Sequence, residues 1–189
     1  MDIDLLGLTA NRIDNIINIT KEVCTQPVEQ DGITFDADSI EAERITEDAD
    51  YEGVRVRFVG HLDTARVHLQ LDIGFGDQVV PSAALMQYPT ILDFSAPNLL
   101  GYSMESTIAE KFEAMVKLDV LNSRMKDFFD IWLLSRQFDF NGHTLVASIT
   151  RTFTNRGTDF PTHPVAFSDS FAKDPSKVTQ WRGFIRKNR

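Results

Sequence analysis

The sequence predicts an α+β protein in which a mixed, mostly antiparallel sheet module is followed by a helical module. Along the first half of the chain, apolar and polar residues alternate with the period of two that is typical of half-buried strands, most clearly over residues 65–74. From Glu105 onward, apolar residues recur at intervals of three and four, which favours helices. We therefore predict two domains, an α/β core over residues 1–90 and a mainly helical module over residues 91–189.

The first module is expected to contain several strands and one helix. Alternation predicts strands at residues 2–5, 33–35, 39–45, 54–58 and 65–74. A helix is expected over residues 12–24, with Asn11 as a candidate N-cap. The tetrapeptide His61-Leu62-Asp63-Thr64 is a candidate turn that joins the last two strands in a hairpin.

The second module is expected to be helical. Residues 79–101 hold three prolines and are typical of a connecting region with one short strand. Apolar stripes then predict helices around Ile108–Val116 and Phe128–Leu133, and two further helices at 143–153 and 175–187.

Composition and charge are those of a globular protein. The 189 residues are 42% hydrophobic, and no apolar run reaches the roughly 20 residues of a membrane span. One cysteine, Cys24, excludes an intrachain disulfide, and no signal peptide follows Met1, so we expect a cytoplasmic protein without a membrane partner. The net charge of −9 is concentrated in residues 29–52, where ten acids accompany one base. Residues 173–189 hold six bases against one acid, so a nucleotide or nucleic-acid partner is compatible with the charge.

Carboxylates are the first candidate functional groups. Asp2 and Asp4 are two residues apart and share one face of a strand, and Asp72 lies on the polar face of a second strand. If these strands are neighbours, three carboxylates converge, and their repulsion favours a bound divalent cation such as Mg²⁺. The alternative is that the acids are solvated on an exposed sheet face, and residue spacing alone favours this alternative.

A second group of candidates lies on the predicted helices. Lys111 is at the edge of an apolar stripe, from which its ammonium could reach a triphosphate, although an ordinary surface lysine fits the same position. Asp127 and Asp130 are three residues apart and could position a base or a second substrate. The alternative for Asp127 is a favourable interaction with the helix dipole.

Four segments, taken in order, resemble the AbiEii/AbiGii toxin family, a branch of the polymerase-β-like nucleotidyltransferases. They are Asp2–Gly7, Leu71–Asp77, Thr107–Met115 and Arg124–Asp130. The resemblance implies that Asp2, Asp4 and Asp72 hold two Mg²⁺ ions, with Asp72 on the general-base side. It also implies that Lys111, with Asp130 beside it, binds the nucleoside triphosphate and that Asp127 lies near the second substrate.

The function implied by the resemblance is transfer of a nucleoside monophosphate from a triphosphate, GTP in the type example, to an RNA such as tRNA or to a protein. The family is associated with toxin–antitoxin systems and phage defence, so an antitoxin protein is an expected partner. Members carry a Gly-Gly-Thr or Gly-Gly-Ser turn ahead of the first aspartates, which this sequence lacks. The alternatives are therefore a fragment of a longer enzyme, or an inactive binding module for which residues 29–52 are a candidate surface.

Overall fold

The computed structural model describes residues 2–29, 31–45, 53–76 and 79–188, with the side chain of Asp2 outside the description. Part of the acidic segment 29–52 therefore lies outside the described residues. The chain divides into two compact units, residues 1–77 and 78–189, which are treated separately below. The predicted α+β class is confirmed: the described residues form a four-stranded mixed sheet and six helices.

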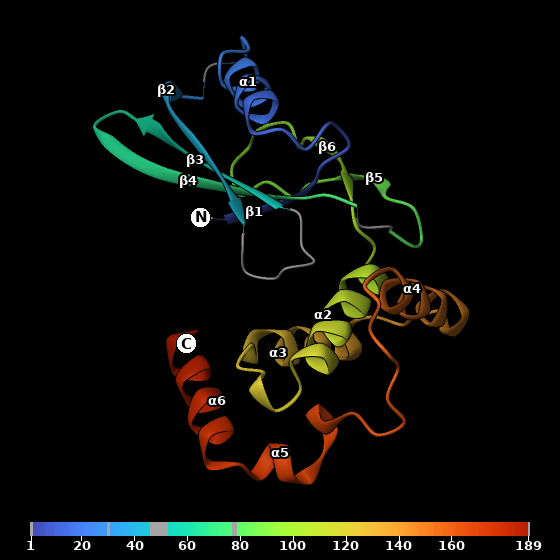
Figure 1. Cartoon of the computed structure of the whole chain (residues 1–189). Helices are drawn as coiled ribbons and strands as arrows, with labels where there is room; N and C mark the ends of the chain where they lie inside the picture. The colour runs from blue at the N-terminus through green and yellow to red at the C-terminus, as the bar shows by residue number, and fades with distance from the viewer. Residues whose placement is uncertain (1, 30, 46–52, 77–78, 189) are drawn as a thin grey trace. The chain divides into compact units, whose positions relative to one another are not determined.

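The sheet of the first unit has the strand order β1-β4-β3-β2 (Figure 1). Its strands are β1 (Asp2–Leu6), β2 (Ile33–Ile45), β3 (Gly53–Leu62) and β4 (Ala65–Gly74). Strand β1 runs parallel to β4, whereas β4 with β3 and β3 with β2 are antiparallel, so the sheet is mixed and mostly antiparallel as predicted. The predicted hairpin is present, because β3 ends at Leu62, two residues form the turn, and β4 follows.

Two local expectations in this unit are wrong. Strand β2 is continuous where two strands were expected, with a register shift between Asp36 and Glu41. Polar side chains support the irregular pairing there, because the Ser39 hydroxyl accepts a hydrogen bond from the Val59 N–H. Asn11 does not cap the helix α1 (Ile13–Cys24), because its side-chain carbonyl accepts from the Arg44 guanidinium instead.

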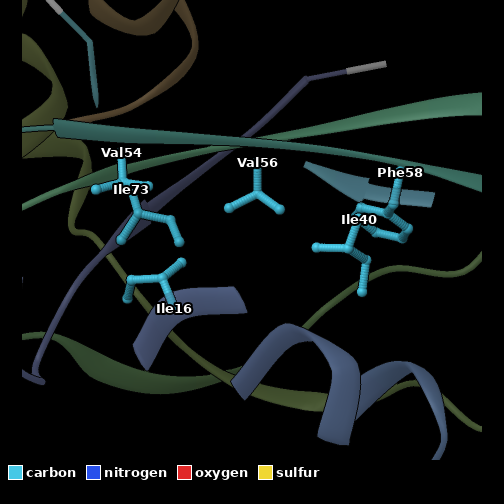
Figure 2. Packing of buried hydrophobic residues seen from close by; sticks show 6 residues of the cluster. All are labelled: Ile16, Ile40, Val54, Val56, Phe58 and Ile73. Atoms are coloured by element: carbon cyan, nitrogen blue, oxygen red, sulfur yellow. The ribbon is translucent and has the colours of Figure 1, made fainter. Parts of the chain in front are cut away.

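The core of the first unit lies between α1 and one face of the sheet. Figure 2 shows Ile16 of α1 below Ile73 of β4 and Val54 of β3, with Ile40 of β2 beside Phe58 farther along the same layer. The buried cluster comprises Ile16, Ile40, Val54, Val56, Phe58 and Ile73. Since neighbouring residues on a strand face opposite sides, burial of Val54, Val56 and Ile73 turns the intervening residues of β3 and β4 to the other face. That other face carries the candidate carboxylates.

The second unit contains a small sheet and five helices in its described part (Figure 1). Strands β5 (Ala84–Gln87) and β6 (Asn98–Gly101) are antiparallel, so the expected connecting region has two short strands instead of one. The helices are α2 (Met104–Leu118), α3 (Met125–Gln137), α4 (Gly142–Asn155), α5 (Asp169–Lys173) and α6 (Pro175–Lys187). All four predicted helices are present, and α6 has the predicted bounds.

Aromatic and buried polar contacts hold the second unit together. Phe112 of α2 packs against Phe153 of α4 with ring centroids 5.4 Å apart. Glu113, which is 1% exposed, pairs with Arg156 at 3.0 Å, so this buried charge has a partner. No helix in the described part of the chain combines the length and apolarity needed to cross a membrane.

Candidate functional site

The polar face of the first unit's sheet brings candidate residues of β1 and β4 into register. Asp4 of β1 pairs with Asp72 of β4, and Asp72 pairs with Arg55 of β3 on its other side. Register partners on adjacent strands share a face, so these three side chains form one row. Asp2 pairs with Gln70 in the next row. The neighbouring strands on which the carboxylate prediction depended are therefore present.

Arg55 holds the Asp72 carboxylate with both of its oxygens engaged. Arg55 Nε donates to Oδ1 at 2.8 Å and Nη2 donates to Oδ2 at 2.7 Å, while Gln70 Nε2 lies 3.4 Å from Oδ2. The hydrogen bonds and positive charge of Arg55 lower the pKa of Asp72 against the opposing effect of partial burial. Asp72 is therefore an ionised, oriented carboxylate at neutral pH.

The side chains on this face offer ligand atoms of the type that Mg²⁺ binds. Carboxylate oxygens are hard ligands of the type that Mg²⁺ prefers, and Asp4 and Asp72 supply them from adjacent strands. Among the described side chains, no group of three acidic, histidine or cysteine residues is close enough to hold a metal ion. An ion at Asp72 would also share or replace the contacts that Arg55 makes. The residues fit the metal chemically, with Arg55 as a competing cation.

The second set of candidates meets between α2 and α3. Lys111 Nζ of α2 lies 2.9 Å from Asp127 Oδ1 and 2.8 Å from Asp130 Oδ2, both on α3. Asp127 and Asp130 reach the same ammonium because residues three apart occupy one helical face. Arg124 Nε approaches Asp127 Oδ2 to 2.8 Å as a second cation. We call these four residues the α2–α3 charge cluster.

Burial makes the charges of this cluster interdependent. Asp127 is 2% exposed, and such a carboxylate is stable as an ion only when it is paired and hydrogen-bonded. Burial acts to lower the pKa of Lys111, but the hydrogen bonds to Asp130 and Asp127 outweigh it and raise that pKa. Lys111 is therefore a charged lysine at neutral pH, with donors directed at oxygen anions.

The loop before α3 connects this cluster to α6. Asn122 is fully buried, and its Oδ1 accepts a hydrogen bond from the Arg124 N–H at 2.8 Å. Lys177 of α6 donates from Nζ to the Asn122 carbonyl oxygen at 2.7 Å. Phe184 of α6 packs against Phe129 of α3, with centroids 5.7 Å apart. Helix α6 is thus fixed to the segment that carries Arg124 and Asp127.

The predicted site residues therefore form two groups, each within one unit. Asp4 and Asp72 face the same side of the sheet, and Lys111, Asp127 and Asp130 are in direct contact. The site roles assigned to these residues and to Asp2 stay predictions. Arg55 was missed, although its alternation with Val54 and Val56 predicts that it shares the face of Asp72.

Comparison with models of known protein families identifies this chain's family. The family model described as nucleotidyl transferase AbiEii toxin, type IV toxin–antitoxin system, matches residues 1–189. No curated protein and no solved structure matches the chain. The family match covers the same segments that carry the two groups of charged residues, and it extends over the whole sequence. The chain therefore belongs to the AbiEii family of nucleotidyltransferase toxins.

Proposed function

We propose that the protein is a Mg²⁺-dependent nucleotidyltransferase that transfers a nucleoside monophosphate from a triphosphate to an RNA, such as tRNA, or to a protein. The observation that carries the proposal is the pairing of Asp4 with Asp72 on adjacent parallel strands, with Asp2 two residues from Asp4. Two neighbouring carboxylates on a polar sheet face repel one another, and a cation bound between them would remove the repulsion that Arg55 leaves. A metal–nucleotide complex supplies that cation together with the substrate.

In the proposed reaction, an acceptor hydroxyl oxygen forms a bond to the α-phosphorus of the triphosphate. The bond from that phosphorus to the bridging oxygen breaks, pyrophosphate leaves, and the hydroxyl proton passes to Asp72. Bound Mg²⁺, as two ions, would stabilise the charge on the attacking and leaving oxygens. Arg55 would hold Asp72 in one orientation, since it grips the carboxylate through two donors.

The α2–α3 charge cluster is proposed to bind the nucleotide. Lys111 carries three donors, and in the structure two carboxylates accept from it. A phosphate oxygen would take a remaining donor, with Asp130 holding the ammonium in place. Asp127 and Arg124 would lie near the second substrate, and GTP is the triphosphate that we propose first. An antitoxin partner, a role in phage defence and a cytoplasmic location belong to the same proposal.

A second candidate function is binding without catalysis, in which the fold serves as an interaction module. The double hydrogen bond from Arg55 to Asp72 favours this candidate, because it satisfies the carboxylate without a metal ion. Calorimetry separates the two candidates. Nucleotide binding that is lost in Asp4→Ala and Asp72→Ala supports the enzyme, and the absence of nucleotide binding supports the interaction module.

The direct experiment incubates the protein with Mg²⁺, α-³²P-labelled nucleoside triphosphates and either tRNA or total cell protein. We expect label to enter one acceptor class and to be lost in Asp4→Asn and Asp72→Asn. Asp14→Asn, at an exposed acid of α1, is the control because it changes the charge equally. Label that persists in both site variants, or never appears in wild-type protein, would overturn the proposed reaction.

A further inference from the structure

Helix α6 presents a basic outer face. Arg182, Arg186 and Lys187 are exposed, and the ion pairs among the described residues include none of them. Arg182 and Arg186 are four residues apart, so their side chains are neighbours on the helix surface, and the helix rise separates them by about 6 Å. These cations give the face a local positive charge on a chain whose net charge is −9.

An aromatic side chain lies beside these arginines. Trp181 is 38% exposed, and its ring packs against Phe184 with centroids 5.7 Å apart. A surface hollow of about 360 Å³ is lined by Trp181, Arg182, Ile185 and Arg186. We call these four residues the α6 surface. It combines an indole held in place by Phe184 with two guanidinium groups that no carboxylate occupies in the described structure.

The acidic residue nearest in sequence does not neutralise this surface. Asp174 is the only acid in residues 173–189, and its Oδ1 accepts from the Ser176 and Lys177 N–H groups at 2.8 and 3.1 Å. That carboxylate is thus engaged at the start of α6, away from Arg182 and Arg186. The outer face therefore keeps its positive charge.

We propose that the α6 surface binds single-stranded RNA, with a base stacked on Trp181 and phosphates bound by Arg182 and Arg186. Aromatic stacking beside arginine–phosphate contacts is the chemistry by which proteins hold single strands. This inference rests on the proposed function, in which RNA is one of the two acceptor classes.

Contacts of α6 connect the proposed RNA-binding surface to the α2–α3 charge cluster. Lys177 contacts the carbonyl of Asn122, and Asn122 in turn accepts from the Arg124 N–H beside Asp127. A strand bound along α6 therefore lies on an element fixed to the segment proposed to contact the second substrate. The α6 surface would hold the acceptor strand while its end reacts.

The test is fluorescence anisotropy of a labelled single-stranded RNA oligonucleotide with the full chain, without triphosphate or Mg²⁺. Arg182→Gln and Arg186→Gln should each weaken binding about fivefold at 0.1 M salt and reduce the slope of log K against log salt by about 0.7. Arg151→Gln, at an exposed arginine of α4, is the matched control and should leave binding unchanged. Equal effects of Arg186→Gln and Arg151→Gln would overturn the inference.

Substitutions of Trp181 test whether its ring stacks on a base. Trp181→Leu should weaken binding roughly fivefold to a hundredfold with an unchanged salt slope, and Trp181→Phe should restore much of it, because the lost contact is stacking. Urea unfolding of each variant confirms that α6 remains packed. Tighter binding to phosphatidylglycerol vesicles or to a polyglutamate peptide than to the oligonucleotide would contradict the choice of RNA.

Transfer assays on the same variants separate this inference from the proposed function. If the oligonucleotide binds through Trp181 and Arg186 but no acceptor is labelled, the α6 surface stands and the proposed reaction fails. If RNA is labelled equally by wild-type protein and by Arg182→Gln/Arg186→Gln at limiting RNA concentration, the reaction stands and the α6 surface is wrong.

Discussion

Arg55 and Asp72 face each other on β3 and β4, and hydrogen bonds of 2.8 and 2.7 Å join the guanidinium to both carboxylate oxygens. On the other side of Asp72 lies its register partner Asp4. The row thus places a cation beside one of two adjacent carboxylates, which offsets part of their repulsion. A ligand that binds the Asp72 carboxylate must therefore share it with Arg55 or displace the Arg55 hydrogen bonds. The Arg55–Asp72 pair thus bears on both the stability of the sheet and the proposed chemistry.

The Arg55–Asp72 pair should contribute to folding. The two side chains are 23% and 18% exposed, so a double-mutant cycle with Arg55→Gln and Asp72→Asn should give a coupling energy of about 1–2 kcal/mol in urea unfolding. The control is Arg57–Glu43 on the same sheet, whose side chains are 51% and 57% exposed and whose coupling should stay below about 0.5 kcal/mol. Equal coupling energies in both pairs would show that the two hydrogen bonds from Arg55 to Asp72 add no stability beyond that of an exposed ion pair.

Mg²⁺ should stabilise the folded protein through Asp4 and Asp72. Because a ligand that binds only the folded state raises its stability, we expect Tm to increase with Mg²⁺ concentration in wild-type protein. Asp4→Asn should abolish this increase while leaving Tm without Mg²⁺ equal or slightly higher, since one of two adjacent charges is removed. Asp14→Asn should keep the Mg²⁺ response. Differential scanning fluorimetry across a Mg²⁺ titration measures all three, and a response retained in Asp4→Asn contradicts the site.

The sheet could be predicted where the pattern is local. Alternation along β3 and β4 and the polar turn between them predicted the hairpin, and Asp63 adopts the positive φ that such a turn uses. The pairing of β1 with β4 joins residues far apart in the sequence, and no local pattern predicts it. The prediction that the carboxylates converge therefore had to assume that these strands are neighbours. Residues 36–38 were expected to separate two strands, but the Asp36 side chain bonds locally, the Ser39 hydroxyl bonds across to β3, and β2 continues through them.

For the charged residues too, local patterns predicted which side chains share a face but not which distant side chains they contact. Helical spacing predicted that Asp127 and Asp130 share a face, and the structure confirms this through their common contact with Lys111. That contact depends on the packing of α2 against α3, which no periodicity encodes. At Asn11 the local pattern predicted a helix cap, but its side-chain oxygen accepts a hydrogen bond from the distant Arg44 instead. Sequence patterns thus place residues on faces, and long-range packing selects their partners.

Lys111 should be required for stability because it neutralises a buried acid. Lys111→Met leaves Asp127, at 2% exposure, with Arg124 as its remaining cation, so we expect a loss of about 3 kcal/mol in the free energy of unfolding. Lys173→Met, which breaks the exposed pair with Asp169, should cost less than about 0.5 kcal/mol. Urea unfolding of both variants makes the comparison, and a small effect at Lys111 would mean that Arg124 alone compensates the carboxylate.

The contribution of Lys111 should also depend on pH at the alkaline end. Its pKa is raised in the folded state by the hydrogen bonds to Asp130 and Asp127, which outweigh burial. The stabilisation is therefore complete below the unfolded-state pKa of about 10.4 and is lost as pH rises through the higher folded-state pKa. The difference in unfolding free energy between wild-type protein and Lys111→Met should stay constant from pH 7 to about 10, then shrink. A gap that shrinks between pH 7 and 9 would contradict this assignment.

Asp174 should control the start of α6 and thus the position of the α6 surface. Hydrogen bonds from the Ser176 hydroxyl and from the Lys177 N–H lower the pKa of Asp174, which caps the helix. Its stabilisation is therefore present above the unfolded-state pKa of about 3.9 and is lost as pH falls through the lower folded-state pKa. Asp174→Ala should lower Tm at pH 7, whereas Asp174→Asn should retain much of the cap, because asparagine accepts the same N–H donors.

The pH profile distinguishes the charge of Asp174 from its hydrogen bonds. As pH falls below about 4, wild-type protein should lose more Tm than Asp174→Asn, since the aspartate at this position can take up a proton and the asparagine cannot. Asp174→Ala should also weaken RNA binding without changing its salt slope, because a frayed first turn releases the Lys177–Asn122 contact while Arg182 and Arg186 keep their charge. If Asp174→Ala lowers Tm and leaves RNA affinity intact, the anchoring of α6 to the loop before α3 has no part in binding the strand.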